Sequence, residues 1–165
     1  MSSPASLKSK DDPKGLVVSE CSTKQFELNK FLYRFIGGKW LWTDKLSWND
    51  QQWKDYVEKD TLRTFVAYSG GSIAGYFELL RESDEVEIIY FGLAEPFIGK
   101  GHGGYLLTEA IKAAWKWENV KRVWVHTCSL DHPSALQNYL SRGMKIYKTE
   151  TADASFSSGS LRRNN

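Results

Sequence analysis

The sequence predicts a single domain of mixed α/β class whose sheet is mostly antiparallel. The chain has 165 residues, of which 41% are hydrophobic, and this is enough apolar material for one core but hardly for two. Its hydrophobic pattern changes several times between the period of a helix and the period of a strand, and no segment repeats. We therefore expect helices packed on one sheet.

The N-terminal half begins with one strand and two helices. A short strand is expected at 15–21 and a helix at 24–35, which the two glycines at 37–38 end. The apolar face of this helix carries four side chains: Leu28, Phe31, Leu32 and Phe35. Ser47 as an N-cap, with Asp50 three residues later, predicts a second helix.

Three β-rich segments follow the helices. They span 61–69, 72–82 and 86–94, and the turns between them are Gly70-Gly71 and Ser83-Asp84. Their period of two and short turns predict a meander of antiparallel hairpins.

The C-terminal half alternates helices with strands. A wide apolar stripe predicts a helix at 103–118, and a β-rich run predicts a strand at 120–128. A short helix is expected from Pro133 to Gly143, because proline suits the first turn of a helix and glycine its end. Residues 144–150 are expected to form a last strand.

Both ends of the chain are polar and rich in serine. We therefore expect a flexible N-terminus at 1–14, one domain at 15–150 and a flexible tail at 151–165.

The charge and cysteine content narrow the classes of partner and compartment. The formal net charge is only +2, which argues against a nucleic-acid or membrane-surface partner and favours a small molecule or a peptide. Cys21 and Cys128 lie far apart, and the N-terminus has no apolar region of a signal peptide. No run approaches the roughly 18 apolar residues of a membrane span. We expect a cytoplasmic protein.

A glycine-rich turn precedes the helix of the C-terminal half. The sequence FIGKGHGGYLL, residues 97–107, has the G-x-G-x-x-G spacing at Gly99, Gly101 and Gly104. A dinucleotide turn is excluded, because residues 94–98 separate the strand from the first glycine and the upstream strands are antiparallel. A P-loop is excluded as well, because no Ser or Thr follows a Gly-Lys pair.

This turn is instead expected to bind an anion. Glycines let successive backbone N–H groups point outward, and the helix that follows adds its unpaired N-terminal donors and its dipole. A pyrophosphate would fit. The alternative is a plain helix-entry loop, which needs only one or two glycines.

From about residue 87 to 147 the chain resembles the GNAT superfamily of N-acetyltransferases. Residues 98–103, IGKGHG, are similar to the family's [QR]-x-x-G-x-[GA] loop, with Gly101 and Gly103 at the small positions and Ile98 at the usual Gln or Arg. The resemblance implies acetyl-CoA as cosubstrate, its pyrophosphate on this loop and its pantetheine arm along the preceding strand, and no metal. It also implies a twisted, mostly antiparallel sheet of six to seven strands flanked by about four helices.

A second block, HPSALQNYLSRGM, resembles the family motif N-x-x-A-x-x-x-Y-x-x-x-G-F. Ala135, Tyr139 and Gly143 match, whereas His132 and Met144 replace the Asn and the Phe. The resemblance implies that Tyr139 lies beside the coenzyme sulfur as general acid; by its pattern alone it is a core tyrosine. The expected coenzyme-binding residues are Phe91, Gly92, Leu93, Ile98, Gly99, Lys100, Gly101, His102, Gly103, Gly104, His132 and Ala135. For Lys100 and His102, a side chain that faces water is the alternative.

The reaction also requires a base for the amine. An alkylammonium with a pKa near 10 is only about 0.1% neutral at pH 7, which adds roughly 4 kcal/mol to the barrier. Glu87 resembles the general-base glutamate of the histone-acetyltransferase members, and strand alternation would place Ile89 and Phe91 on its face. A base that acts through water, with Glu87 as a solvated strand-end acid, is the alternative.

Aromatic residues gather between the first two helices. In the family this region covers the acceptor side, and aromatic walls attract an apolar or cationic acceptor. Tyr33, Trp40 and Trp42 are therefore candidate substrate-binding residues, with Arg34 as a carboxylate clamp. Core packing is the alternative for all of them and is the expected role of Trp48 and Trp53.

The segment HTCSLDH, residues 126–132, could suggest a metal site or a Cys–His nucleophile. Its potential ligands lie within seven residues, whereas zinc sites usually use two well-separated pairs, so we expect no metal. Asp131 or His132 is expected to cap the helix that starts at Pro133.

These residues together predict an acetyl-CoA-dependent N-acetyltransferase that acts on a primary amine of a small molecule, amino acid or peptide. Two alternatives stay open: a protein lysine or N-terminal acetyltransferase, and a non-catalytic acyl-CoA-binding regulatory module. The protein is expected to be a monomer or a homodimer.

Overall fold

The computed structural model describes residues 1–151. The main elements follow the chain in this order: β1 (Val17–Glu20), α1 (Phe26–Gly37), α2 (Asp50–Val57), β2 (Leu62–Ser69), β3 (Ser72–Glu82), β4 (Glu85–Leu93), α3 (His102–Trp115), β5 (Arg122–Val125) and α4 (Ala135–Ser141). The predicted class, a mixed α/β fold with four α-helices, is confirmed.

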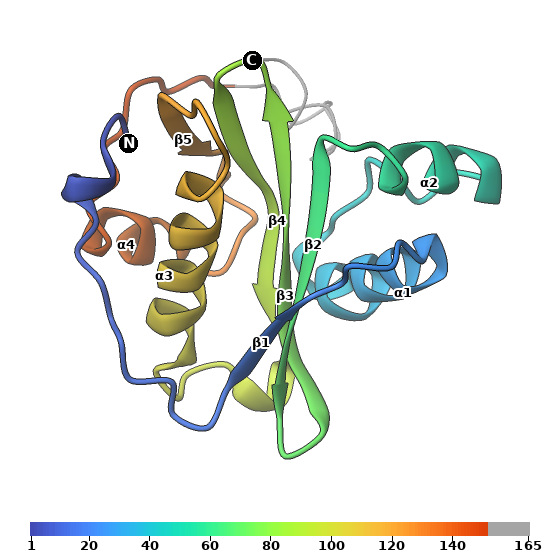
Figure 1. Cartoon of the computed structure of the whole chain (residues 1–165). Coiled ribbons are helices and arrows are strands. Elements are labelled where there is room, and N and C mark those ends of the chain that lie inside the picture. Colours follow the sequence, from blue (N-terminus) through green and yellow to red (C-terminus); the bar gives the residue numbers. More distant parts are fainter. Residues whose placement is uncertain (152–165) are drawn as a thin grey trace.

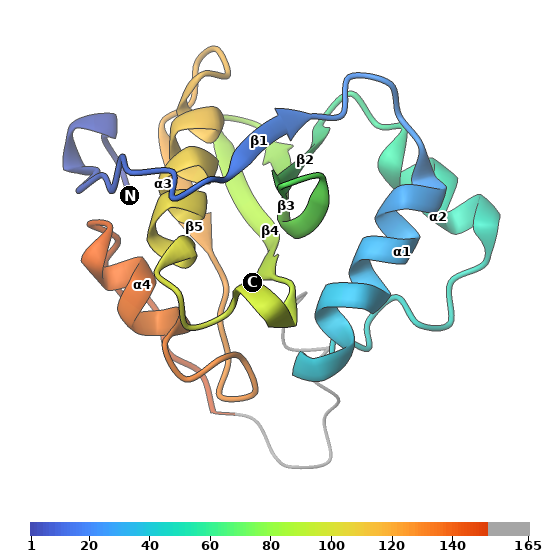
Figure 2. The ribbon, with the colours of Figure 1, turned by 90° about the horizontal axis from the view of Figure 1, so that it is seen from below.

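One sheet runs through the molecule in the order β1-β2-β3-β4-β5. The first four strands are antiparallel neighbours, as the short turns predict, and β5 is parallel to β4. The parallel pair is possible because α3 carries the chain back along the sheet between the two strands. Helices α1 and α2 cover one face of the sheet, and α3 and α4 cover the other (Figures 1 and 2).

Each face of the sheet has its own hydrophobic core. The face under α3 is filled by Leu106, Leu107, Ala110, Ile111 and Ala114 of that helix, all fully buried. The face under α1 and α2 is rich in aromatic residues, including Tyr33, Trp42, Trp53, Tyr76 and Tyr90. Because both faces are covered, β3 has no solvent face and six consecutive residues of it are buried.

The face of helix α1 that packs on the sheet differs from the predicted one. Leu32 and Ile36 are buried, whereas Phe31 and Phe35 stack on each other at the surface and remain about half exposed. The expected face was therefore partly wrong. The polar residue Asn29 is also on the buried side, where its amide donates to Thr64 Oγ1 at 2.8 Å.

The N-cap of helix α2 lies two residues after the predicted one. Asn49, not Ser47, is the N-cap: its Oδ1 accepts from the Gln52 N–H, and the Gln52 side chain accepts from the Asn49 N–H, both at 2.9 Å. This reciprocal pair satisfies two N–H groups at once.

A β-bulge interrupts β4 at Ile89. Leu79 of β3 pairs with Ile88, but its neighbour Glu78 pairs with Tyr90, so Ile89 is the extra residue. After the bulge the side chains exchange faces, because alternation has period two. Ile88 therefore packs under α3, whereas Tyr90 packs under α1 and α2.

The predicted last strand at 144–150 does not form, and the described sheet has five strands rather than six or seven. Ile146 and Tyr147 of this segment are exposed, and Tyr147 lies against the Arg122 guanidinium. Met1 occupies the outer edge of β5 instead: its amino group donates to Val123 O at 2.8 Å, and its carbonyl accepts from Val123 N at 2.9 Å.

The N-terminal segment 1–14, expected to be flexible, lies along α3 and α4 (Figures 1 and 2). Lys8 N donates to Arg142 O at 2.9 Å, and Lys10 N donates to Thr108 Oγ1 at 2.9 Å. Backbone groups make these bonds, so polar composition does not prevent the segment from docking. The predicted tail at 151–165 falls, beyond residue 151, outside the described residues.

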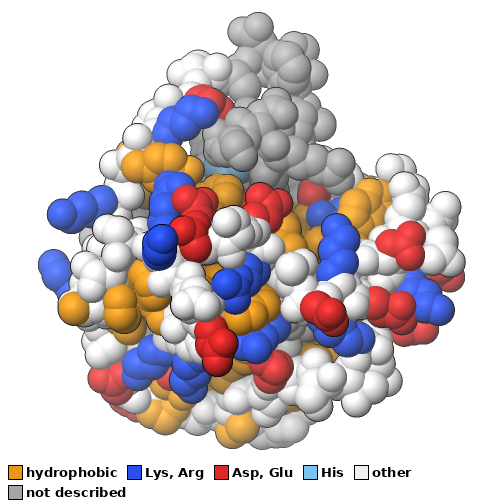
Figure 3. Space-filling model, turned by 45° about the horizontal axis from the view of Figure 1, so that its top comes forward, with side chains coloured by type: hydrophobic (Ala, Val, Ile, Leu, Met, Phe, Trp, Pro, Cys, Tyr) orange, Lys and Arg blue, Asp and Glu red, His pale blue; other side chains and the backbone are white. Residues whose placement is uncertain are grey.

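Among the described helices, none is long and apolar enough to cross a membrane. Acidic and basic side chains are mixed on the face shown in Figure 3, as the small net charge leads us to expect.

Candidate active site

A cleft of about 350 Å³ opens where β4 and β5 part. The two strands pair only as far as Ile88 and Val125, and β4 then continues to Leu93. No described strand pairs with β4 on that side after Ile88, so the backbone groups that point there are available to a ligand. Phe91, Gly92 and Leu93, the predicted arm-binding residues, line this edge.

The glycine turn closes one end of the cleft. Gly99 and Gly101 have φ values of 79° and 83°, in the left-handed region that favours glycine. Gly101 is the N-cap of α3 and no side chain caps the helix, so its first N–H groups are left for a ligand. Of the predicted residues of the turn, Ile98, Gly99, Gly101, His102, Gly103 and Gly104 line the cleft, whereas Lys100 is exposed and does not.

His102 is the most buried polar residue of this turn, with 8% of its surface exposed. Its ring lies edge-on to Phe97, and its Nδ1 has no hydrogen-bond partner among the described residues. The expectation that His102 faces the coenzyme stays a prediction.

Helix α4 forms the wall opposite β4. The Asn138 amide donates to Gly103 O at 3.0 Å and ties this helix to the glycine turn. Tyr139 is 7% exposed, lines the cleft and meets the Phe91 ring edge-on, with the ring centres 6.3 Å apart. Ala135 and His132 also line the cleft. The structure thus brings Tyr139, both motifs and the end of β4 together.

Some lining residues were not predicted, and they include Lys10, Asn138 and Arg142. Asn138 and Arg142 share the helical face of Ala135 and Tyr139, since the spacing is three and four residues; this periodicity could have identified them. Lys10 lies in a polar terminus whose pattern carries no such signal.

Glu87 is not among the described residues that line the cleft. It lies opposite Trp124. Burial is the main cause that raises the pKa of Tyr56, a residue of the core under α1 and α2, and the charge of Glu87 adds to it. The expectation that Glu87, Ile89 and Phe91 share a face is wrong for Phe91, because the bulge at Ile89 turns Phe91 toward α3. Glu87 is therefore not placed to contact a ligand in the cleft directly.

Two of the four predicted acceptor-site residues lie elsewhere. Tyr33 is 1% exposed in the core under α1 and α2, and Arg34 lies on the outer surface of α1 beside Phe31 and Phe35. Trp40 and Trp42 do line the cleft. The Trp40 ring meets His132 edge-on, which brings the segment after α1 to the start of α4.

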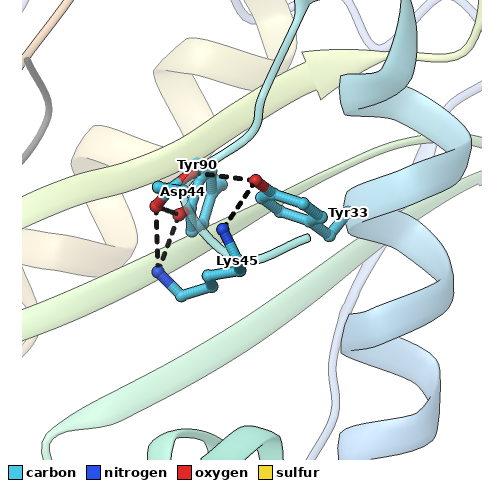
Figure 4. A network of polar contacts seen from close by, with 4 residues as sticks. All are labelled: Tyr33, Asp44, Lys45 and Tyr90. Carbon is cyan, nitrogen blue, oxygen red and sulfur yellow. Dashed lines mark hydrogen bonds and ion pairs between the residues drawn. The ribbon is translucent and has the colours of Figure 1, made fainter. Parts of the chain in front are cut away.

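A buried polar network holds the segment between α1 and α2 (Figure 4). The Asp44 carboxylate accepts from the hydroxyls of Tyr33, at 2.8 Å, and Tyr90. Lys45 Nζ lies 3.2 Å from Asp44 Oδ2 and donates to Tyr90 OH at 2.7 Å. The ammonium also lies over the rings of Trp48 and Tyr56, each centre 4.6 Å away. Sequence reasoning missed this network.

The network depends on its ion pair. Burial alone raises the pKa of Asp44, but the charge of Lys45 and the hydrogen bonds from Tyr90 and Tyr33 outweigh it and lower the pKa below its usual value. Burial also raises the pKa of Tyr90 well above its usual value. Asp44 is therefore a carboxylate and Tyr90 a neutral phenol at neutral pH. Trp42, packed on Tyr90 with ring centres 5.0 Å apart, is the link to the cleft.

The loop at 126–132 is organised by its own hydrogen bonds. Asp131 Oδ2 accepts from the Thr127 hydroxyl at 2.7 Å and from Cys128 N at 3.0 Å. His132 Nδ1 accepts from Ser134 N at 3.1 Å, just before α4. Asp131 thus does not cap α4, and His132 satisfies one N–H at its start. Within residues 1–151, no group of three or more His, Cys, Asp or Glu is placed to hold a metal ion.

Comparison with known families decides the affiliation of this chain. Residues 25–144 match the model of the acetyltransferase (GNAT) family. The chain belongs to the GNAT family. The match includes the glycine turn, the end of β4 and α4, so all described residues that line the cleft except Lys10 lie in the part of the chain shared with the family, which uses acetyl-CoA.

Solved structures share the fold. An aminoglycoside acetyltransferase from an uncultured soil metagenomic sample, in complex with trehalose, superposes with a TM-score of 0.67 at 14% identity, covering 85% of this chain and 95% of that one. AAC(6')-Iy in complex with the bisubstrate analogue CoA-S-monomethyl-acetylneamine gives 0.62 at 12% identity, with 84% and 96% covered.

The ribosomal-protein-S18-alanine N-acetyltransferase from Escherichia coli gives a TM-score of 0.59 at 16% identity, with 78% and 76% covered. No curated protein sequence matches significantly. The chain is an N-acetyltransferase of the GNAT family, and the structural neighbours differ in the acceptors their names state.

Proposed function

We propose that the protein transfers the acetyl group of acetyl-CoA to a primary amine of a small molecule, amino acid or peptide, by direct attack of the amine on the thioester. The observation that carries this proposal is the cleft: it runs from the uncapped start of α3, along the unpaired edge of β4, to Tyr139. These residues fit the coenzyme, because its pyrophosphate needs hydrogen-bond donors and the amides of its pantetheine arm can pair with a strand edge.

Bound acetyl-CoA supplies an activated acetyl thioester, and the chain's own groups supply the rest. Backbone N–H groups at the end of β4, with Leu93 the candidate taken from the family, polarise the thioester carbonyl. Tyr139 protonates the departing thiolate, which turns a poor leaving group into a thiol. In support of this role, Tyr139 is 7% exposed and lines the cleft.

The amine must also lose a proton. Of the two schemes that the sequence left open, the position of Glu87 outside the cleft lining supports removal of the proton through water rather than directly by Glu87. Trp40 and Trp42 form an aromatic wall to the cleft, and this supports a cationic or apolar acceptor.

The direct test uses thiol release from acetyl-CoA with panels of amines and peptides. Tyr139→Phe is expected to lower kcat by roughly tenfold or more, because the general acid is lost, with coenzyme affinity unchanged. Tyr147→Phe, an exposed tyrosine outside the cleft, is the matched control. Equal turnover in Tyr139→Phe and the wild type would remove Tyr139 from the mechanism. Coenzyme binding without thiol release for any acceptor would instead indicate a binding module.

A further inference from the structure

The N-terminal segment brings lysines to the glycine turn. A Cβ placed on Gly101 would lie 2.5 Å from Lys14 Nζ, and one placed on Gly104 would lie 2.6 Å from Lys10 Cδ. Lys10 also lines the cleft. Both side chains thus lie against the start of α3, although they are about 90 residues distant from it in the sequence.

A third cation reaches the same place from the end of α4. Arg142 Nη1 would lie 2.8 Å from that Cβ on Gly104, so Lys10 and Arg142 flank one glycine. Nε and Nη1 of Arg142 are buried, and neither has a hydrogen-bond partner among the described residues. Arg142 as a whole is only half-buried, but N–H groups that are removed from water need an acceptor, because an unpaired buried donor is costly.

The segment is held in place independently of any ligand. Lys10 N donates to Thr108 Oγ1 at 2.9 Å, and the Thr108 hydroxyl donates to Gly104 O at 2.8 Å. Asp11 pairs with Lys112 on the outer side of α3 at 2.9 Å, which turns that carboxylate away from the three cations. The lysines are therefore presented to the turn by a docked backbone.

We propose that Lys10, Lys14 and Arg142 bind the phosphate groups of the acyl-CoA substrate, so that residues 1–14 are part of the coenzyme site. This inference rests on the proposed function. Three cations from two distant segments meet the uncapped N-terminus of a 14-residue helix, and this combination selects a ligand with several negative charges. It also supplies the side-chain contacts that Ile98 cannot make.

Titration calorimetry of the full chain with coenzyme A tests the proposal. The variants are Lys10→Gln, Lys14→Gln and Arg142→Gln, and Lys8→Gln is the matched control, an exposed lysine of the same segment that does not line the cleft. Loss of a charge-assisted contact should weaken binding by about five- to tenfold for Lys10→Gln and Arg142→Gln, and less for Lys14→Gln, because Lys14 does not line the cleft. Lys8→Gln should stay within about twofold.

A second set of ligands separates phosphate binding from an effect on the fold. Acetyl-pantetheine, which lacks phosphates, should be used as donor equally well by all variants, and 3'-dephospho-CoA should retain the differences if the pyrophosphate is the group bound. Loss of the differences with 3'-dephospho-CoA would assign the cations to the 3'-phosphate, which still supports the proposal. Lys10 is exposed, so Lys10→Gln is expected to fold. This variant therefore tests the proposal even if Arg142→Gln does not fold.

Two results would overturn the inference. One is wild-type affinity for coenzyme A in both Lys10→Gln and Arg142→Gln; the other is an equal loss with acetyl-pantetheine. If the wild type itself binds no coenzyme A, the proposed function fails together with the inference, whereas normal wild-type binding with unaffected variants removes the role of the cations alone.

Discussion

Glu78 is an acidic side chain inside the core under α1 and α2. It is 1% exposed, and burial raises its pKa to about 7, although the positive charge of Lys45 opposes this shift. Its burial follows from the covering of both sheet faces, because neither side of β3 then meets solvent. Alternation along one strand cannot reveal this, since it predicts one buried and one exposed face.

The raised pKa of Glu78 makes stability depend on pH. The native state keeps this proton up to about pH 7, whereas the unfolded chain releases it near pH 4.5. Stability is thus present below pH 4.5 and falls as the pH rises toward 7, by about 3 kcal/mol at 1.36 kcal/mol per pKa unit. In Glu78→Gln this component of the free energy of unfolding should disappear.

Urea unfolding at pH 5 and pH 8 measures the effect. The wild type should lose about 2 to 3 kcal/mol more than Glu78→Gln between the two pH values. Glu82→Gln, on the exposed end of the same strand, is the control and should follow the wild type. Parallel pH profiles for wild type and Glu78→Gln would contradict the assignment of a raised pKa.

The polar network of Figure 4 is a further residue-scale feature that the sequence did not reveal. Asp44 and Lys45 are adjacent charged residues in a loop, a pattern typical of solvated surface. The pair is buried because aromatic residues from other elements, among them Tyr33 and Tyr90, pack over it. Tyr33 was expected at the acceptor site because its residue type fits a cation, but the same residue type fits a buried hydroxyl network.

At the scale of elements, the helices and the hairpins were predicted, but some of their boundaries differ from the prediction. The signals S-x-x-D at 47–50 and N-x-x-Q at 49–52 overlap, and each is a valid start for α2. The structure uses the second, because the Gln52 side chain reaches back to the Asn49 N–H.

The two capping signals can be separated by mutation. Asn49→Ala should lower the free energy of unfolding by about 1 kcal/mol, since it leaves the Gln52 N–H without its acceptor. Ser47→Ala should change it by less than about 0.5 kcal/mol. Urea unfolding of both variants gives the comparison, and a larger loss for Ser47→Ala would restore Ser47 as the cap.

The bulge in β4 explains why Glu87, the predicted base, does not share a face with Phe91. Glu87, Ile89 and Phe91 alternate in the sequence, so they were expected on one face. The bulge is a backbone feature without a glycine or proline to mark it, and it moves Phe91 to the other face. The bulge is also the point at which β4 separates from β5. The sequence pattern could not show this bulge, although it opens the cleft.

At the scale of the whole molecule, the fold class and the place of the glycine turn followed from the sequence. The turn was predicted from its glycines, whereas the role of Tyr139 was implied by the resemblance of its block to the family motif. The docking of residues 1–14 was not, because its bonds come mainly from backbone groups that any residue possesses. Met1 pairs with the edge of β5, and the expected last strand does not form.

The central claim is that one cleft holds the coenzyme from the start of α3 to Tyr139. The most direct test is a crystal structure of the full chain with coenzyme A. We expect the pyrophosphate at the N–H groups of residues 101–104 and the thiol beside Tyr139, in the gap between β4 and β5. Coenzyme A bound elsewhere, or with its thiol remote from Tyr139, would contradict this account.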